Sequence, residues 1–556
     1  MKTVNSKAII LALLLILLFA SPIFSQVNYE PLNKSIYGYL DRLSIQGYFQ
    51  IDSEIKPFSR IYIAKKLKIV IEDKNDKLTP LENQELIFYT EEYARELKRI
   101  NVNVDSILVD KNGKFNLWGV VGFNEYGRFH LVDYDDSLFT FTLDPILGYK
   151  YGNGKLTSET HLWNGLSFYG RISDWVGFDL NFRDNTETGD NIDYTRGFSP
   201  LTGFTFRVKK ERGFEFDEVN ANLTFSNSWG SFTIGKDYVY YGEGKQGKLI
   251  LGNKAPSFPQ LKIEVYPTDW FKFSYVHGWL NSQVIDSSTI RYNESGWESF
   301  QHVPKYYVAH EFSFTPWKVF NFTIGESIVY SDAFQPIYLI PVMFFRLADH
   351  YFTHPDNVAG NAQLFGSFWY NIPKIKTKFY GTLFIDEFSI QNSDGPRAVG
   401  YTIGADIINP IIPESELVVE YTKIDPYVYF HHDDAQTYTN YDYQLGHWIG
   451  SNSDQVYLAF TKHIIRGLRV KGWFTYIRRG SREDPTEPRY QDKNYFLWGA
   501  RSNYTSWGIT ARYEIIHDVF ASAVYRSRQT SEQRSEGGEF TDTNGSEFAF
   551  TLNYGF

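Results

Sequence analysis

The chain has 556 residues, a formal net charge of −10 and no cysteine. The lack of cysteine excludes disulfides, thiol catalysis and metal sites with cysteine ligands. Acidic and basic residues are interspersed without a basic block that could neutralise phosphates, which argues against a nucleic-acid partner.

The N-terminal segment is typical of an export signal. Lys2 and Lys7 flank a short polar stretch, and an apolar run then extends from Ala8 to Ala20. This run is shorter than the roughly 20 residues that a membrane-spanning helix needs. The small residues that follow suggest cleavage after Ser25, so we expect residues 1–25 to be a signal peptide.

Three segments with helical periodicity follow the signal, at residues 33–46, 57–71 and 79–97. Thr79 is a good N-cap for the third, because Pro80 stands at the first helical position and Glu82 completes a capping box. Such short amphipathic helices bury little surface by themselves. We therefore expect residues 26–110 to form a periplasmic helical bundle that docks on the remainder of the chain.

Residues 111–556 carry the alternating pattern of β-strands. In the final strand Phe548, Phe550 and Leu552 alternate with small or polar residues, and the sequence ends on Phe556. Aromatic residues make up 18% of the chain, as expected of a transmembrane β-barrel with rings at both membrane interfaces. The composition and the strand spacing predict an antiparallel barrel of roughly 16–18 strands.

Charged residues within the predicted strands indicate which face points inward. Arg469, Lys471 and Arg512 alternate with apolar neighbours. A basic side chain facing lipid costs about 2–4 kcal/mol near the membrane midplane, so these three residues must face the lumen. The lumen is therefore expected to be polar and charged.

Long polar connections are expected at the extracellular end, at residues 184–193, 282–301, 425–454 and 478–494. They contain aromatic rings, including Trp297, Tyr441 and Trp448, that could stack on sugar rings beside Asp, Asn and Tyr groups. The alternative is that these rings belong to the aromatic girdle at the outer membrane interface.

Signals of catalysis and metal binding are absent from the sequence. Asp386 and Glu387 are neighbours on a predicted strand and point to opposite faces, so they cannot act together as an acid–base pair. The cluster from His431 to Asp434 consists of adjacent residues, which rarely converge on one ion. No nucleophile elbow, HExxH sequence or phosphate-binding loop is present. We expect no catalytic residue, no metal and no cofactor.

The segment from Tyr240 to Pro259 reads YYGEGKQGKLILGNKAPSFP. It resembles the glycine-rich signature of the Wzi-type capsule assembly proteins, which combines an aromatic pair, Gly-Pro-Gly, a further Gly, Leu-Ile-Leu-Ser, Asn, Ala and Pro. The stretch 310–330 is similar to a strand pair of that family, and 338–341 followed by Asp356 and Asn357 is similar to its Tyr-Leu-Asn-Pro and Asp-Asn pair. Glu243, Gly252 and Ile340 depart from the family pattern.

The resemblance implies an 18-stranded outer-membrane barrel with a periplasmic helical bundle and a lectin-like role without catalysis. Glycines in the signature permit unusual backbone angles, and the residues around them could line a polar surface for the ligand. The alternative is that these glycines shape a turn or bulge at the barrel rim. Candidate ligand contacts in the matching segments are Tyr240, Tyr241, Gly242, Glu243, Lys245, Asp356 and Asn357.

The sequence therefore predicts a non-enzymatic barrel in the outer membrane of a Gram-negative bacterium. We expect it to bind capsular or extracellular polysaccharide and to anchor or organise it at the cell surface, with outer-membrane lipid and the polysaccharide export machinery as further partners. A diffusion porin or uptake channel is one alternative. An outer-membrane lipid or glycan hydrolase is another.

Overall fold

The structure is a computed structural model that describes residues 28–555, apart from 52–54, 74–77, 109–115, 118–120, 125, 155–157, 191, 193–195, 206, 212, 353–359, 389–396 and 482–494. The signal-peptide prediction for residues 1–25 falls outside these residues. Within the described ranges, no helix is both long enough and apolar enough to span a membrane.

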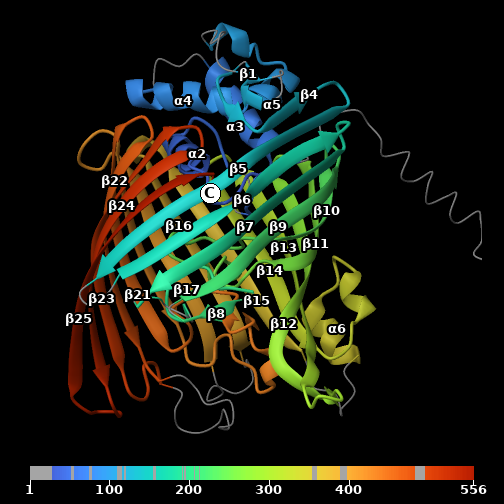
Figure 1. Cartoon of the computed structure of the whole chain (residues 1–556), viewed down its shortest axis with the longest axis vertical. Coiled ribbons are helices and arrows are strands. Elements are labelled where there is room, and N and C mark those ends of the chain that lie inside the picture. Colours follow the sequence, from blue (N-terminus) through green and yellow to red (C-terminus); the bar gives the residue numbers. More distant parts are fainter. Residues whose placement is uncertain are drawn as a thin grey trace, which may run out of the picture.

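A closed antiparallel barrel forms most of the molecule (Figure 1). Two short strands of the sheet, β4 and β8, are not needed to close the wall. Their neighbours pair directly with one another, β25 with β5 and β7 with β9. Eighteen strands remain and close the wall, as the resemblance implied. The ring comprises β4 (Val132–Asp135), β5 (Phe139–Gly154), β6 (Ser158–Ile172), β7 (Val176–Gly189), β8 (Val208–Lys210), β9 (Gly213–Ser226), β10 (Gly230–Asp237), β11 (Phe258–Thr268), β12 (Phe271–Tyr292), β13 (Glu298–Trp317), β14 (Phe320–Ser331), β15 (Asn361–Ile372), β16 (Thr377–Phe388), β17 (Arg397–Ile408), β18 (Ser415–Ile424), β21 (Ser453–Ile465), β22 (Leu468–Arg479), β23 (Ser502–Ile516), β24 (Val519–Gln533) and β25 (Phe540–Tyr554).

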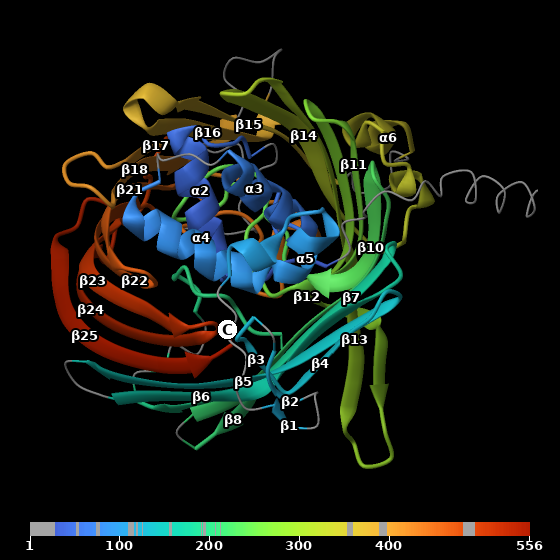
Figure 2. The same ribbon diagram turned by 90° about the horizontal axis from the view of Figure 1, so that it is seen from above.

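The remaining elements are short and lie inside, above or beside the ring (Figures 1 and 2). Four helices lie at one mouth of the barrel, which we name the bundle end, and the opposite mouth is the loop end. These elements are α2 (Ile36–Gln46), α3 (Arg60–Glu72), α4 (Pro80–Glu92), α5 (Ala94–Arg99), η1 (Val104–Ser106), β1 (Asn116–Leu117), β2 (Val121–Phe123), β3 (Phe129–His130), η2 (Pro336–Leu339), α6 (Phe345–Phe352), η3 (Pro373–Ile375), η4 (Asp434–Gln436), β19 (Thr439–Asn440) and β20 (Tyr443–Gln444).

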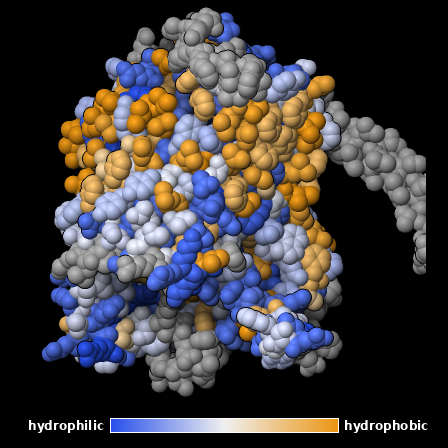
Figure 3. Space-filling model, viewed as in Figure 1, coloured by the Kyte–Doolittle hydropathy of each residue, from blue (hydrophilic) through white to orange (hydrophobic). Residues whose placement is uncertain are grey.

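The outer face of the barrel carries an apolar band. Figure 3 shows this band over the half of the wall next to the bundle. In β25, Phe548, Phe550 and Leu552 are all exposed on the outside, which confirms the predicted alternation. Four exposed tryptophans stand in or beside neighbouring tight turns at the bundle end, as an interfacial girdle requires. They are Trp175, Trp229, Trp270 and Trp317.

The three basic side chains that the sequence assigns to the lumen face it, as predicted. Arg469 and Arg512 line a cavity of about 30 Å³ together with residues of α2 and α4. Lys471 shares the face of β22 on which Ile477 is buried in the luminal core. The barrel interior is therefore polar where the helices enter it.

The bundle forms where the helical patterns predicted it. Thr79 accepts a hydrogen bond from the Glu82 amide, and the Glu82 carboxylate accepts one from the Thr79 amide, which completes the predicted capping box. The third predicted helix is divided at Tyr93 into α4 and α5. Figure 2 shows the helices lying across the mouth of the ring.

Ion pairs fasten the bundle to the barrel turns. Asp518, in the turn between β23 and β24, pairs with Lys34 and with Arg128, the latter at 2.6 Å. Arg128 also pairs with Glu92 of α4 at 3.0 Å. Burial alone would raise the pKa of the Asp518 carboxyl, but the charges of Lys34 and Arg128 outweigh it and hold that pKa at about 2. The bundle is thus docked by charge as well as by shape.

Candidate functional site

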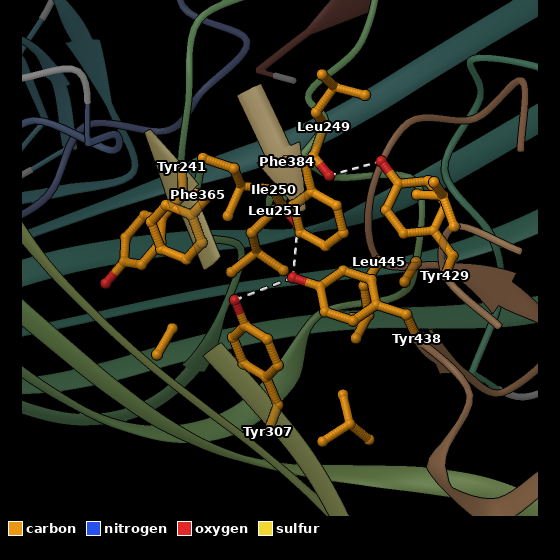
Figure 4. Packing of buried hydrophobic residues seen from close by; sticks show 14 of the residues in the cluster. Tyr241, Leu249, Ile250, Leu251, Tyr307, Phe365, Phe384, Tyr429, Tyr438 and Leu445 are labelled. Carbon is orange, nitrogen blue, oxygen red and sulfur yellow. Dashed lines mark hydrogen bonds between the residues drawn. The ribbon is translucent and has the colours of Figure 1, made fainter. Parts of the chain in front are cut away.

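The glycine-rich segment lies inside the barrel. It belongs to the connection between β10 and β11, which begins at mid-wall because β10 has only 8 residues. Its Leu249, Ile250 and Leu251 are fully buried. They pack against the connection between β18 and β21, which also folds inward, and together these residues form a luminal core that we name the septum (Figure 4).

Tyrosine hydroxyls tie the two halves of the septum together. The Tyr429 hydroxyl donates to the carbonyl of Leu249 at 2.6 Å, and the Tyr438 hydroxyl donates to the carbonyl of Ile250 at 2.8 Å (Figure 4). The Tyr438 hydroxyl also lies within hydrogen-bond distance of the hydroxyl of Tyr307 on β13, at 3.2 Å. These bonds satisfy backbone groups that would otherwise be buried without partners.

Positive backbone angles shape the start of the glycine-rich segment. Gly242 has φ 89° and Gly244 has φ 145°, which side-chain-bearing residues rarely adopt. At Gly244 a Cβ would lie 2.2 Å from the carbonyl oxygen of Gly247. The resulting turn directs the amides of Lys245 and Gln246 at the Glu420 carboxylate of β18, at 2.6 and 3.0 Å. The glycines therefore serve the turn, which favours the structural alternative for these positions.

A network of ion pairs surrounds the turn. The Lys245 ammonium lies 2.6 Å from Asp406 of β17 and 3.6 Å from Asp41 of α2. Glu243 pairs with Lys378 of β16 at 2.9 Å. Burial opposes the charge on Glu243, but Lys378 and the neighbouring lysines lower the pKa of that carboxyl below its usual value. The network joins the bundle, the glycine-rich segment and the wall.

A chamber of about 370 Å³ lies between the septum and the bundle. Tyr240, Lys245 and Trp448 line it, so three of the predicted ligand contacts converge there. The Trp448 indole donates to the carbonyl of Gln246 at 3.1 Å, which fixes the ring. The volume lies within the roughly 300–1,000 Å³ of small-ligand pockets. Aromatic and cationic side chains around such a space could contact a sugar unit.

The other predicted ligand residues lie elsewhere. Tyr241 is fully buried in the septum, and its hydroxyl lies 2.9 Å from that of Ser274. Tyr441 packs at the edge of the septum, where its amide donates to the carbonyl of Asn281. Trp297 is 75% exposed at the tip of the β12–β13 hairpin. Asp356 and Asn357 fall outside the described residues.

The connection between β7 and β8 contributes residues that the sequence patterns did not indicate. Phe198 packs against Trp448, with ring centroids 5.2 Å apart and ring planes inclined at 58°. Lys254 donates to the carbonyls of Ser199 and Leu201, at 2.7 and 2.9 Å, and thereby holds this connection inside the barrel. The only local feature of the sequence that could have indicated this contact is the position of Lys254, next to the Ala-Pro of the glycine-rich signature.

Asp386 and the cluster from His431 to Asp434 form hydrogen bonds that hold the backbone. Asp386 accepts a hydrogen bond from the Tyr429 amide at 2.5 Å and so anchors the inward loop. His431 accepts one from the Asp433 amide, and Asp433 caps η4. In the described ranges, no three His, Asp or Glu side chains are grouped so that they could hold a metal ion.

Comparisons with known proteins agree with this architecture. Residues 121–540 match the family model described as capsule assembly protein Wzi. A solved structure of Wzi from Escherichia coli, described as a carbohydrate-binding outer-membrane β-barrel involved in group 1 capsule assembly, is 13% identical. It has a TM-score of 0.55, with 96% of this chain and 100% of that chain covered.

Two further solved structures are less similar. OprD from Pseudomonas aeruginosa is 9% identical with a TM-score of 0.40, covering 74% of this chain and 94% of that one. OccAB4 from Acinetobacter baumannii is 8% identical with a TM-score of 0.39, covering 75% and 97%. No curated protein sequence matches the chain. Because the family model spans most of its length, the chain belongs to the Wzi capsule assembly family.

Proposed function

We propose that this protein resides in the outer membrane, binds exported polysaccharide without catalysis, and holds it at the cell surface. The observation that carries the proposal is the filled lumen of a barrel from a capsule assembly family. The apolar outer band and the tryptophans near the bundle-end turns support the membrane location, with the bundle in the periplasm.

The filled lumen favours binding over transport. The septum, the inward connection held by Lys254 and the ion-paired bundle all occupy space that a diffusion channel keeps open. Asp386, one of the two neighbouring strand carboxylates that cannot form an acid–base pair, serves as a backbone anchor. We therefore favour a lectin-like role over the porin and hydrolase alternatives.

The β12–β13 hairpin is the surface best placed to meet polysaccharide outside the cell. Its strands, of 22 and 20 residues, run to the loop end (Figure 1) and extend outside the ring there (Figure 2). Trp297 and Tyr292 expose their rings at the tip of this hairpin. Exposed rings beside polar groups can stack on the apolar faces of sugars. The luminal chamber with Tyr240, Lys245 and Trp448 is a second candidate contact.

The proposal is tested by polysaccharide retention. In a strain that lacks the gene, complementation with the wild-type protein should restore cell-bound polysaccharide. The double variant Tyr292→Ala/Trp297→Ala should reduce the retained amount several-fold, because it removes both stacking surfaces. The measurement is the ratio of cell-bound to released polysaccharide at equal protein level.

Tyr134→Ala is the matched control, since Tyr134 is an exposed ring on β4 at the bundle end. This variant should retain as much polysaccharide as the wild type. Loss of the gene without any change in retention would refute the tethering role. Normal retention by the double variant would show that the polysaccharide does not bind to the hairpin rings.

A further inference from the structure

A segment outside the barrel covers the wall between β12 and β14. It follows β14 and comprises η2 and the first half of α6, residues 336–348, which we name the wall segment. Figures 1 and 2 both place α6 outside the ring, whereas α2–α5 lie over its mouth. Phe345 and Ala348 are buried against outward-facing residues of these strands.

The wall segment covers ionisable groups on the lipid-facing side. His310 and Glu326 are directly opposite one another on β13 and β14, and Nε2 of His310 lies 3.3 Å from Glu326. Their neighbours Ala309 and Val329 belong to the luminal septum, so both ionisable side chains point outward. Yet both are nearly fully buried, and the Phe345 amide donates to Glu326 at 2.6 Å.

The position of His310 along β13 gives its depth. It stands seven residues from Trp317, which marks the membrane interface at the bundle end. At about 3.3 Å per residue and a strand tilt of roughly 40°, this distance corresponds to about 18 Å. The apolar band of such barrels is about 25 Å tall. His310 and Glu326 therefore lie inside the band, in the half farther from the bundle.

The outer surface of the wall segment is mostly apolar, and Arg346 is its one exposed charged side chain. The large apolar side chains exposed on it are those of Leu339, Ile340, Val342, Phe344 and Leu347. They continue the apolar band outward over the covered polar pair. A segment that faced water would expose these five residues at a substantial hydrophobic cost, about 25 cal/mol per Å².

We propose that the wall segment lies in the outer leaflet of the membrane and contacts lipid acyl chains through these exposed side chains. The inference rests on the proposed outer-membrane location. It accounts for two observations together: a polar pair on a lipid-facing wall, and an apolar surface on the segment that covers this pair. The Tyr275 hydroxyl, which donates to the Tyr338 carbonyl at 2.6 Å, fastens the segment to the wall.

The test uses single cysteines, because the chain has none of its own. Leu347→Cys reports on the wall segment. Leu383→Cys on β16, exposed on the outer wall next to the septum residue Phe384, is the lipid-facing reference. Glu294→Cys, exposed in the hairpin turn, is the water-facing reference. Each full-length variant carries the same fluorophore in phosphatidylcholine vesicles whose acyl chains are either plain or brominated.

Brominated chains should quench the label at Leu347 nearly as strongly as at Leu383 and several-fold more than at Glu294. Quenching at Leu383 but not at Leu347 would overturn this inference alone. Quenching at neither position would overturn the membrane location as well. Each sample is first checked for a folded, protease-resistant barrel. Val342→Cys replaces Leu347→Cys if the latter fails to fold.

Discussion

At the scale of single residues, the glycine-rich segment shows how a signature can serve a fold rather than touch a ligand. Tyr241 and the Leu-Ile-Leu run are core residues, and Gly244 makes a turn that no other residue fits easily. Only Tyr240, Lys245 and Trp448, among the predicted ligand contacts, share a chamber. The signature therefore encodes mainly the geometry that closes the lumen.

Gly244→Ala should destabilise the protein and disorder the segment around Lys245. The new Cβ would meet the Gly247 carbonyl, and φ 145° strains any side-chain-bearing residue. Gly252→Ala is the control, because its Cβ would have an ordinary contact 3.4 Å from the Lys248 side chain. The measurement is the thermal unfolding midpoint in detergent. Equal midpoints for the two variants would contradict the role assigned to Gly244.

At the scale of elements, the glycine-rich segment and the helical bundle meet inside the barrel. The Tyr240 amide donates to the carbonyl of Lys56 at 2.9 Å, so the glycine-rich segment meets the bundle directly. Lys245 links the same segment to α2 and to β17. The bundle is thus held by charged groups whose protonation depends on pH.

Acid should loosen the bundle. The folded-state pKa of Asp518 is about 2, below the value of about 3.9 expected in the unfolded chain. Its ionised form therefore contributes stability above about pH 4, roughly 2–3 kcal/mol, and this contribution is lost as the pH falls toward 2. The stability contributed by Asp41 depends on pH in the same direction. Burial would raise the pKa of this carboxyl, but Lys56 and Lys245 outweigh the burial and lower that pKa.

Spin labels measure this loosening. Cysteines at Lys65 of α3 and Lys374 of a barrel turn should give one narrow distance distribution at pH 7 that broadens below pH 4. Labels at Lys374 and Ile411, both at barrel turns, should keep their distance throughout. Parallel behaviour of the two pairs would indicate unfolding of the barrel instead of release of the bundle.

At the scale of the whole molecule, the barrel is filled from both ends. The septum closes the side formed by β12–β18, and the connection through Phe198 fills space beside Trp448 and Tyr504. The helical bundle covers the mouth at the bundle end. A hydrophobic septum inside a polar barrel is the feature that most clearly separates this molecule from an open channel.

The wild-type protein should therefore show no large, stable conductance steps in planar bilayers. A variant that lacks residues 28–106 and has short flexible linkers in place of 196–205, 240–256 and 427–450 should conduct, since the bundle, the inward connection held by Lys254 and both halves of the septum are removed. The measurement is single-channel current at fixed voltage. Porin-like steps from the intact wild type would revive the uptake-channel alternative.

Much of the architecture follows from local sequence patterns. The alternation in β25, the charges at Arg469 and Lys471, and the capping box at Thr79 each specify a face or an end of an element. The strand spacing in the sequence predicts only a range of roughly 16–18 strands. The exact number of strands came from the resemblance to the Wzi-type family. Local patterns succeed here because a strand in a membrane barrel has only two environments, lipid and lumen.

The sequence by itself determined the helical bundle, the strands and the faces that they present. Only the tertiary structure decided that the glycine-rich segment lies inside the wall and that residues 336–348 lie outside it. Tyr438 bonds to Ile250 across 188 positions, and His310 and Glu326 face outward under a cover supplied by Phe345. Such contacts depend on chain closure around the barrel, which no local periodicity encodes.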